Sequence, residues 1–457
     1  MSILHNIFFF IVAIGVLVTF HEFGHYWVAR KAGVKVLRFS IGFGRPLIRW
    51  SRKTEEGDDV EFVIAAIPLG GYVKMLDERE GNVDEADKAR AFNNQNVAKR
   101  IAIVFAGPAF NFILAIALYW VVFMLGSNVD RPFVGEPPAG TMVAEAGFKA
   151  QDEILSVGDT SIRSWNEFRL AILDQGLDGG RLEIKVTDAD GGEYIRELNL
   201  ADTRLLADEG DIFEHIGFSQ WWPELAAEIG GVFDEGAAKQ AGLQQGDVVV
   251  RANGEEVGQW LQLVELIRKN PGNAMQFIVL RDGEELSLTV TPQTRESTDG
   301  VDEGVIGAYQ HIPEDIRSML VGRIEYTAFE SMPKAVVKTW DMSVLTLRVL
   351  WKMVSGEASL SNISGPITIA TYAGVTASIG LVSFFSFLAV ISVSLGVLNL
   401  LPVPMLDGGH LFYYLIEILK GSPVSEAFEL RGQQVGIAVL ALLMSVAIFN
   451  DIQRLVQ

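Results

Sequence analysis

Residues 7–29 read IFFFIVAIGVLVTFHEFGHYWVA, an apolar run that ends in the pattern His-Glu-x-x-His. On a helix, His21 and His25 lie one turn apart on the same face, where two imidazoles can share one Zn²⁺. Glu22 is then placed to accept a proton from a water molecule at such a site. The run is long enough to cross a bilayer, where ionisable groups usually face a cavity and have a function. The stretch predicts a zinc site within a membrane span; the alternative is a chance pattern in a helix that binds no metal.

Composition points to a membrane protein with large aqueous parts. Of the 457 residues, 49% are hydrophobic and 21% are charged. The net charge of −20 argues against nucleic acid as a partner. The chain has no cysteine, so a zinc ion would be held by histidines and carboxylates. The first apolar segment has no basic leader and no small-residue cleavage site, and we interpret it as a retained span.

Four transmembrane helices are predicted from the hydropathy pattern. They fall within residues 1–29, 99–126, 380–434 and 435–457, and the third of these ranges also holds a cytoplasmic loop. Lys and Arg residues follow the first span, and residues 30–54 contain no acidic residue. The positive-inside rule therefore places this side in the cytoplasm. Both termini and the region after the second span are then expected on the outer side, and the His/Glu cluster lies toward the cytoplasmic end of the first span.

Residues 30–98, between the first two spans, have the period of strands. The segment 61–75 reads as two apolar strands interrupted by proline and glycine. We expect a membrane re-entrant β-hairpin there, and proteases often bind extended substrates by adding them to a sheet edge. The alternative is a small cytoplasmic sheet that does not contact substrate. The residues predicted to contact substrate in this hairpin are Ile67, Gly70, Gly71, Tyr72 and Val73.

An internal repeat with an offset of 95 residues lies after the second span. Residues 146–155 (AGFKAQDEIL) match residues 241–250 (AGLQQGDVVV), which predicts two copies of one domain. The expected boundaries are 127–221 and 222–310. The pattern A-G-L-x-x-G-D resembles PDZ domains, although Gln151 stands where glycine is usual. PDZ domains bind peptide ends by strand addition; the alternative is that this pair only restricts access to the active site.

The region 311–379 is expected to hold an amphipathic helix at the membrane interface. Apolar residues between positions 324 and 355 recur at helical spacing among basic residues, and they are Val337, Trp340, Val344, Leu347, Trp351 and Val354. The alternative is that this helix packs against the external domains.

A second stretch, residues 399–409 (NLLPVPMLDGG), completes the predicted site. A catalytic zinc normally has three protein ligands and one open position. Asp407 follows the third span at its cytoplasmic end, at the same membrane level as the two histidines. A carboxylate in this apolar, Pro/Gly-broken stretch requires a metal or a partner. We predict Asp407 as the third ligand and His410 as a further ligand or neighbour; the alternative for Asp407 is a turn residue before two glycines.

The motifs together resemble the site-2 protease family of intramembrane zinc metalloproteases, over essentially the whole chain. In order, they are His21-Glu22-x-x-His25, Gly107-Pro108-x-x-Asn111, the PDZ-like pair, and Asn399-x-x-Pro402-x-Pro404-x-Leu406-Asp407-Gly408. The resemblance implies a multi-pass α-helical protein of the bacterial inner membrane. Four transmembrane helices are accompanied by a membrane-associated β-hairpin region and two extracytoplasmic PDZ-like α+β domains.

The resemblance also implies the roles of the site residues. One zinc ion is held by His21, His25 and Asp407, Glu22 is catalytic, and Asn399 binds substrate. Family members of this kind cut a transmembrane anti-sigma factor after another protease has removed its periplasmic part, in the envelope stress response, and they degrade remnant signal peptides. Asn111 is interpreted as a packing residue between helices.

Two further classes of protein are considered. One is a non-enzymatic membrane receptor or scaffold that senses peptides through the PDZ-like domains. The other, weaker, is a metal transporter, for which no second intramembrane ligand cluster is evident.

Overall fold

The structure is a computed structural model that describes residues 3–53, 57–177, 179–201, 212–296, 302–359, 361 and 363–456. The chain forms two compact units. One combines Met1–Ser127 with Ile324–Asp451, and the other consists mainly of Asn128–Arg323.

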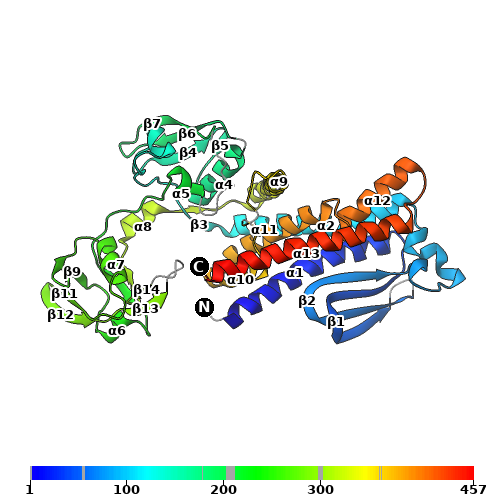
Figure 1. Ribbon diagram of the computed structural model, residues 1–457, viewed down its shortest axis with the longest axis horizontal. Helices are drawn as coiled ribbons and strands as arrows, with labels where there is room; N and C mark the ends of the chain where they lie inside the picture. The colour runs from blue at the N-terminus through cyan, green and yellow to red at the C-terminus, as the bar shows by residue number, and fades with distance from the viewer. Residues whose placement is uncertain are drawn as a thin grey trace. The chain divides into compact units, whose positions relative to one another are not determined.

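Four helices of the first unit are long and apolar enough to cross a membrane, which confirms the predicted number of spans. They are α1 (Ile3–Lys31), α2 (Val97–Leu125), α11 (Leu381–Leu400) and α13 (Glu426–Val456). Helix α2 packs against both α1 and α11 (Figure 1). Leu17, Leu114 and Leu388 lie in one buried cluster that joins these three helices. The helices that carry the two halves of the predicted site are therefore packed together.

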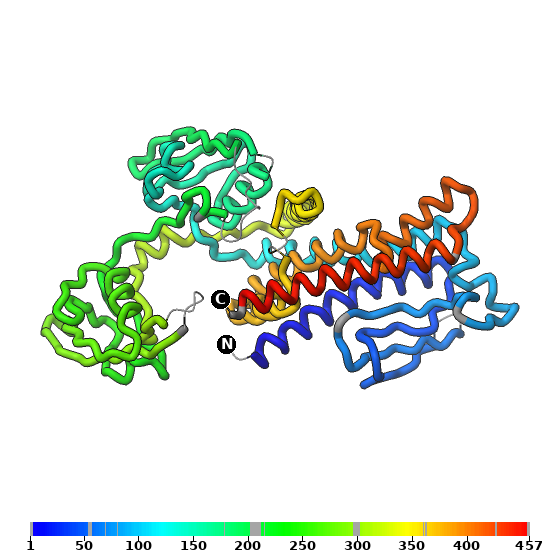
Figure 2. Tube along the Cα trace, viewed as in Figure 1, coloured from blue at the N-terminus to red at the C-terminus, as the bar shows by residue number. Residues whose placement is uncertain are grey.

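The segment between the third and fourth spans differs from the sequence prediction. We expected a cytoplasmic loop up to residue 434, but the segment contains helix α12 (Asp407–Lys420), and α13 already begins at Glu426 (Figure 2). Gly408 and Gly409 resemble turn residues, yet here they form the packed face of α12. A Cβ on either glycine would meet the backbone of the preceding loop, at Leu401 and Val403. The first turns of α13 are polar, so the hydropathy pattern did not indicate that the helix begins before residue 435.

The region between α1 and α2 forms a sheet from two long bent strands, β1 (Val36–Lys53) and β2 (Asp59–Met75). Residues 38–41 of β1 pair with both 61–64 and 71–74 of β2, so each strand contributes twice to the sheet. Residues 71–75 are left at one edge, and the sheet lies along α1 (Figure 1). Three 3₁₀ helices connect it to α2, and they are η1 (Glu78–Glu80), η2 (Glu85–Arg90) and η3 (Phe92–Asn94).

The second unit holds two sheets with the same construction, in agreement with the predicted repeat. The first has the strand order β5-β4-β6-β7 and the second β10-β9-β11-β12. The elements of the first copy are β3 (Ser127–Asp130), α3 (Met142–Glu145), β4 (Glu153–Val157), β5 (Thr160–Ser161), α4 (Trp165–Gly176), β6 (Arg181–Thr187), β7 (Glu193–Asn199) and α5 (Ile212–Ile216). Those of the second copy are β8 (Ile229–Val232), α6 (Ala237–Gln240), β9 (Val248–Ala252), β10 (Glu255–Glu256), α7 (Trp260–Arg268), β11 (Met275–Arg281), β12 (Glu284–Val290), β13 (Gln293–Glu296), β14 (Asp302–Val305) and β15 (Ala308–Gln310). Their PDZ-like character stays a prediction.

A buried aspartate occupies the same position in both copies. The side chains of Asp152 and Asp247 are fully buried, and each accepts a hydrogen bond from the backbone N–H three residues earlier. Arg196 pairs with the first and Arg281 with the second, from different strands. Both domains thus pair a buried aspartate with an arginine, but the arginine comes from a different strand in each domain.

The predicted amphipathic helix is present as α9 (Ala328–Val354), which follows α8 (Glu314–Leu320) and β16 (Val321–Ile324) and precedes α10 (Pro366–Ile379). Its small residues are buried, including Ser331 and Ala335, and the helix packs on α2 and α11. Trp340 and Trp351 are 70% and 69% exposed. One face of the helix, which includes Ala335 and the buried Leu345, therefore makes the protein contact, while the two tryptophans face outward, a pattern typical of a helix at a membrane interface.

Candidate metal centre and active site

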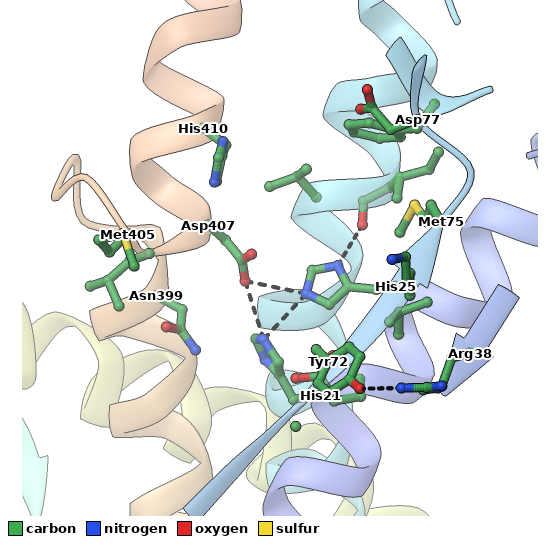
Figure 3. A pocket seen from close by; sticks show the side chains of 18 of the residues that line it. His21, His25, Arg38, Tyr72, Met75, Asp77, Asn399, Met405, Asp407 and His410 are labelled. Atoms are coloured by element: carbon green, nitrogen blue, oxygen red, sulfur yellow. Dashed lines mark hydrogen bonds and ion pairs between the residues drawn. The ribbon is translucent and has the colours of Figure 1, made fainter. Parts of the chain in front are cut away.

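The three predicted ligands come together in the structure (Figure 3). Nε2 of His21 lies 3.2 Å, and Nε2 of His25 3.4 Å, from Oδ2 of Asp407, and the two nitrogens are 3.3 Å apart. Both histidines stand on α1, and Asp407 is the first residue of α12. Two segments far apart in the sequence thus place three metal-binding atoms around one point.

This donor set fits a zinc ion. Nδ1 of His25 donates to the carbonyl of Ile103 at 2.8 Å, which leaves the lone pair of Nε2 for a metal. Oδ2 of Asp407 is buried and has no hydrogen-bond partner in the described structure. A buried carboxylate oxygen without a partner is costly. Two imidazole nitrogens and one carboxylate oxygen are ligands that catalytic zinc accepts, with one position left open.

Asn111, on α2, has a more specific place than packing. Its amide nitrogen lies 3.0 Å from Nδ1 of His21, and its amide oxygen is buried without a hydrogen-bond partner in the described structure. Turning the amide by 180° satisfies this oxygen, which then accepts the Nδ1–H of a neutral imidazole and leaves Nε2 of His21 free for a metal. The structure therefore brings Asn111 against a candidate ligand, which the packing interpretation missed. The spacing to Gly107, one turn earlier on the same helical face, was the available signal.

Gly107 makes room for the two histidines. A Cβ at this position would lie 2.8 Å from Cε1 of His21 and even closer to Nε2 of His25. A side chain at residue 107 would therefore occupy the space that the imidazole rings need. Gly107, the first residue of the Gly-Pro-x-x-Asn motif, contributes by having no side chain, which leaves this volume to the imidazole rings.

Glu22 and the sheet edge face a common cavity of about 750 Å³. Glu22 is 8% exposed and lies against Gly71, where an added Cβ would be 2.8 Å from Cγ of Glu22. The lining includes the three metal-binding residues, Glu22, Asn399, Gly71, Tyr72, Val73 and His410. Of the predicted substrate-contact residues, Ile67 and Gly70 are not among those that line this cavity, and Ile67 pairs with Phe43 farther along the sheet.

The sheet edge is held at the cavity by polar contacts. Arg38 donates to Glu61 at 2.6 Å and to the hydroxyl of Tyr72 at 3.1 Å. Where the segment leaves β2, burial acts to raise the pKa of Asp77, but hydrogen bonds from Arg79 outweigh it and hold this pKa below its usual value. The ion pair between Asp77 and Arg79 thus lies at the rim of the cavity, next to the extended backbone of residues 71–75.

The arrangement defines a class of protein: a metal-dependent peptidase whose site lies among apolar helices. The model for Peptidase family M50 matches residues 9–443. The chain belongs to this family, the site-2 proteases, and is a zinc metalloprotease.

Individual relatives are similar over their full length. The chain is 42% identical to a regulator of sigma E protease from Salmonella typhi, with 100% of each chain covered. It is 41% identical to the regulator of sigma-E protease RseP from Escherichia coli K12, again with 100% of each chain covered. A protease RseP from Yersinia pestis is 40% identical over 100% of both chains.

Proposed function

We propose that this protein hydrolyses peptide bonds within the transmembrane segments of single-pass membrane proteins. The observation that carries the proposal is the convergence of His21, His25 and Asp407, from two apolar helical segments, on one cavity that also exposes Glu22. A site at this depth is reached by a substrate that is itself in the membrane.

The residues divide the chemistry among them. Zinc, when bound to His21, His25 and Asp407, supplies Lewis-acid activation of the attacking water and of the scissile carbonyl. Glu22 accepts the proton from that water and delivers it to the leaving amine. Asn399 donates a hydrogen bond to the substrate backbone or to the oxygen that becomes negative.

The edge of β2 binds the substrate in extended form. Gly71, Tyr72 and Val73 lie at this edge and line the cavity. A substrate helix hides its carbonyls in its own hydrogen bonds, so it has to unwind before it can pair with the edge. Substrates with helix-breaking residues near the cut are therefore cleaved faster than helix-stabilised ones.

The physiological substrates are a transmembrane anti-sigma factor that has already lost its periplasmic part, and remnant signal peptides. The names of the relatives, regulators of sigma E, support the first of these. The protein lies in the bacterial inner membrane with both termini and the two PDZ-like domains on the periplasmic side. These domains act as a size filter that admits only trimmed substrates; the alternative role is the binding of peptide ligands.

The receptor alternative has less support. A receptor that senses peptides through its external domains needs no buried carboxylate beside two histidines, yet Glu22 and Asp407 both face the cavity. Retention of both acids therefore favours the protease.

The decisive experiment uses purified protein in detergent with a single-span substrate that has no large ectodomain. Wild type and Glu22→Gln are compared for cleavage, and zinc is counted in each. We expect cleavage by wild type alone and about one zinc per chain in both. Equal cleavage by the two proteins would show that Glu22 is not the catalytic base. If zinc-loaded wild type cuts none of several such substrates, the result would favour the receptor alternative.

A further inference from the structure

His410 lines the active-site cavity, and its ring nitrogens make no structural hydrogen bond within the described chain. It lies three residues after Asp407 on α12, so the two side chains share one face of the helix. It lines the cavity, the residue is exposed, and Figure 3 shows the ring directed into the space beside Asp407. Within the described chain no hydrogen bond or ion pair engages the ring nitrogens of His410; its one ring neighbour is Tyr413, edge-on with centroids 6.4 Å apart.

The geometry separates His410 from the candidate ligands. The group of side chains whose metal-binding atoms all lie within 4.8 Å consists of His21, His25 and Asp407, and His410 is not in it. A catalytic zinc also needs its fourth position open. His410 is thus next to the centre but not part of the donor set.

We propose that His410 is a catalytic residue that donates an N–H hydrogen bond to the reacting peptide group of the substrate. A neutral imidazole always carries one N–H, so this donor is available without a change of charge. Asn399 lies in the last turn of α11 and His410 begins the second turn of α12, so the two donors flank Asp407 along the chain. Gly71, Tyr72 and Val73 line the same cavity as Asn399 and His410, so a peptide paired with this edge lies in the cavity that both donors line. This inference rests on the proposed proteolysis at this site and adds a second donor to it.

The energetic reason is that negative charge develops on the oxygen of the scissile carbonyl in the transition state. A fixed donor aimed at that charge is worth about 100-fold or more in rate. It acts in the transition state, so its loss lowers kcat more than it raises KM.

The test compares His410→Ala, His410→Gln and wild type, with Phe412→Ala as the control for disturbance of α12. Phe412 is exposed, at 44%, and does not line the cavity. Three quantities are measured for each protein: zinc per chain, kcat and KM with a single-span substrate, and the dissociation constant of a peptide phosphonamidate, whose tetrahedral phosphorus group imitates the charged transition state. The last is a binding measurement and needs no turnover.

We expect His410→Ala to keep its zinc, to lose about 100-fold in kcat, and to bind the phosphonamidate weaker by a similar factor. Glutamine retains an N–H donor and restores part of both losses, whereas Phe412→Ala behaves as wild type. Loss of zinc from His410→Ala would make the residue a ligand or a positioning residue and overturn the proposal. So would unchanged phosphonamidate affinity. Since Glu22→Gln tests the proteolysis itself, cleavage by wild type together with full activity of His410→Ala would reject only the role of His410.

Discussion

At the scale of single residues, the site depends on the fact that residue 107 is a glycine and has no side chain. Gly107 faces both imidazole rings, and the backbone of α2 comes so close that no Cβ fits. We predict that Gly107→Ala loses most of its bound zinc and with it all cleavage, because the rings are pushed from their positions. Zinc per chain in the purified protein is the measurement. Gly15→Ala is the matched control, since an added Cβ on that helix position meets nothing within 4 Å.

Asn111 is not a predicted metal ligand but contacts His21, which is one. Its hydrogen bond to Nδ1 of His21 sets the tautomer and the ring orientation. Asn111→Leu should weaken zinc binding about 10- to 100-fold, the usual cost of removing such a partner. Competition with a chelator of known affinity measures the change. Asn111→Asp keeps an acceptor oxygen and should stay closer to wild type; equal zinc affinity in all three proteins would contradict the assignment.

At the scale of elements, the free edge of β2 is the feature to test. Successive residues of a strand direct their N–H groups to opposite edges, and proline removes one of these donors while edge strands tolerate it. Of Val73→Pro and Lys74→Pro, we expect one to lose at least about 10-fold in cleavage with zinc retained. The measurement is the initial rate with a single-span substrate. Full activity of both variants would rule out strand addition at this edge.

The second repeat contains a pH-sensitive ion pair. Arg281 donates two hydrogen bonds, each 2.7 Å, to the buried carboxylate of Asp247. Burial acts to raise the pKa of Asp247, but Arg281 and the backbone N–H of Gln244 hold it below its ordinary value. The stabilisation is therefore complete above about pH 4, the unfolded pKa, and is lost as the pH falls through the lower folded pKa.

Asp247→Asn should accordingly destabilise this repeat by about 2 kcal/mol at pH 7, through loss of charge-assisted hydrogen bonds. Hydrogen-exchange protection of β9 and β11, in the full-length protein, measures the effect. The difference from wild type should shrink below about pH 4. Asp234→Asn is the control, because that carboxylate is 89% exposed. A constant difference at all pH values would mean that shape rather than charge is responsible.

At the scale of the whole molecule, the two repeated domains are connected to the helical unit through β3 after α2 and β16 before α9. If they exclude bulky substrates, removal of residues 130–310 should allow cleavage of a substrate that still carries its ectodomain. Gel analysis of cleavage products measures this, with Glu22→Gln in the shortened chain as the control. Continued refusal of the intact substrate, while a trimmed substrate is cut, would count against the filter.

Much of the architecture could be read from the order of residues. The four spans follow from apolar length, which depends only on consecutive residues. The repeat follows from local self-similarity, and the helical spacing of apolar residues predicted α9. Helix α12 was missed because Gly408 and Gly409 have weak helical propensity, and close packing against the preceding loop overrides it.

The sequence by itself determined the chemistry available to this protein: two histidines one turn apart, a glutamate between them, and an aspartate in a second apolar region. Only the tertiary structure decided which groups meet. The packing of α1, α2 and α12 brings Asp407 to the histidines, places Asn111 behind His21 and leaves His410 facing the cavity. Local pattern reports what a segment can do alone, whereas a hydrogen bond between residues 90 positions apart exists only after the helices have packed.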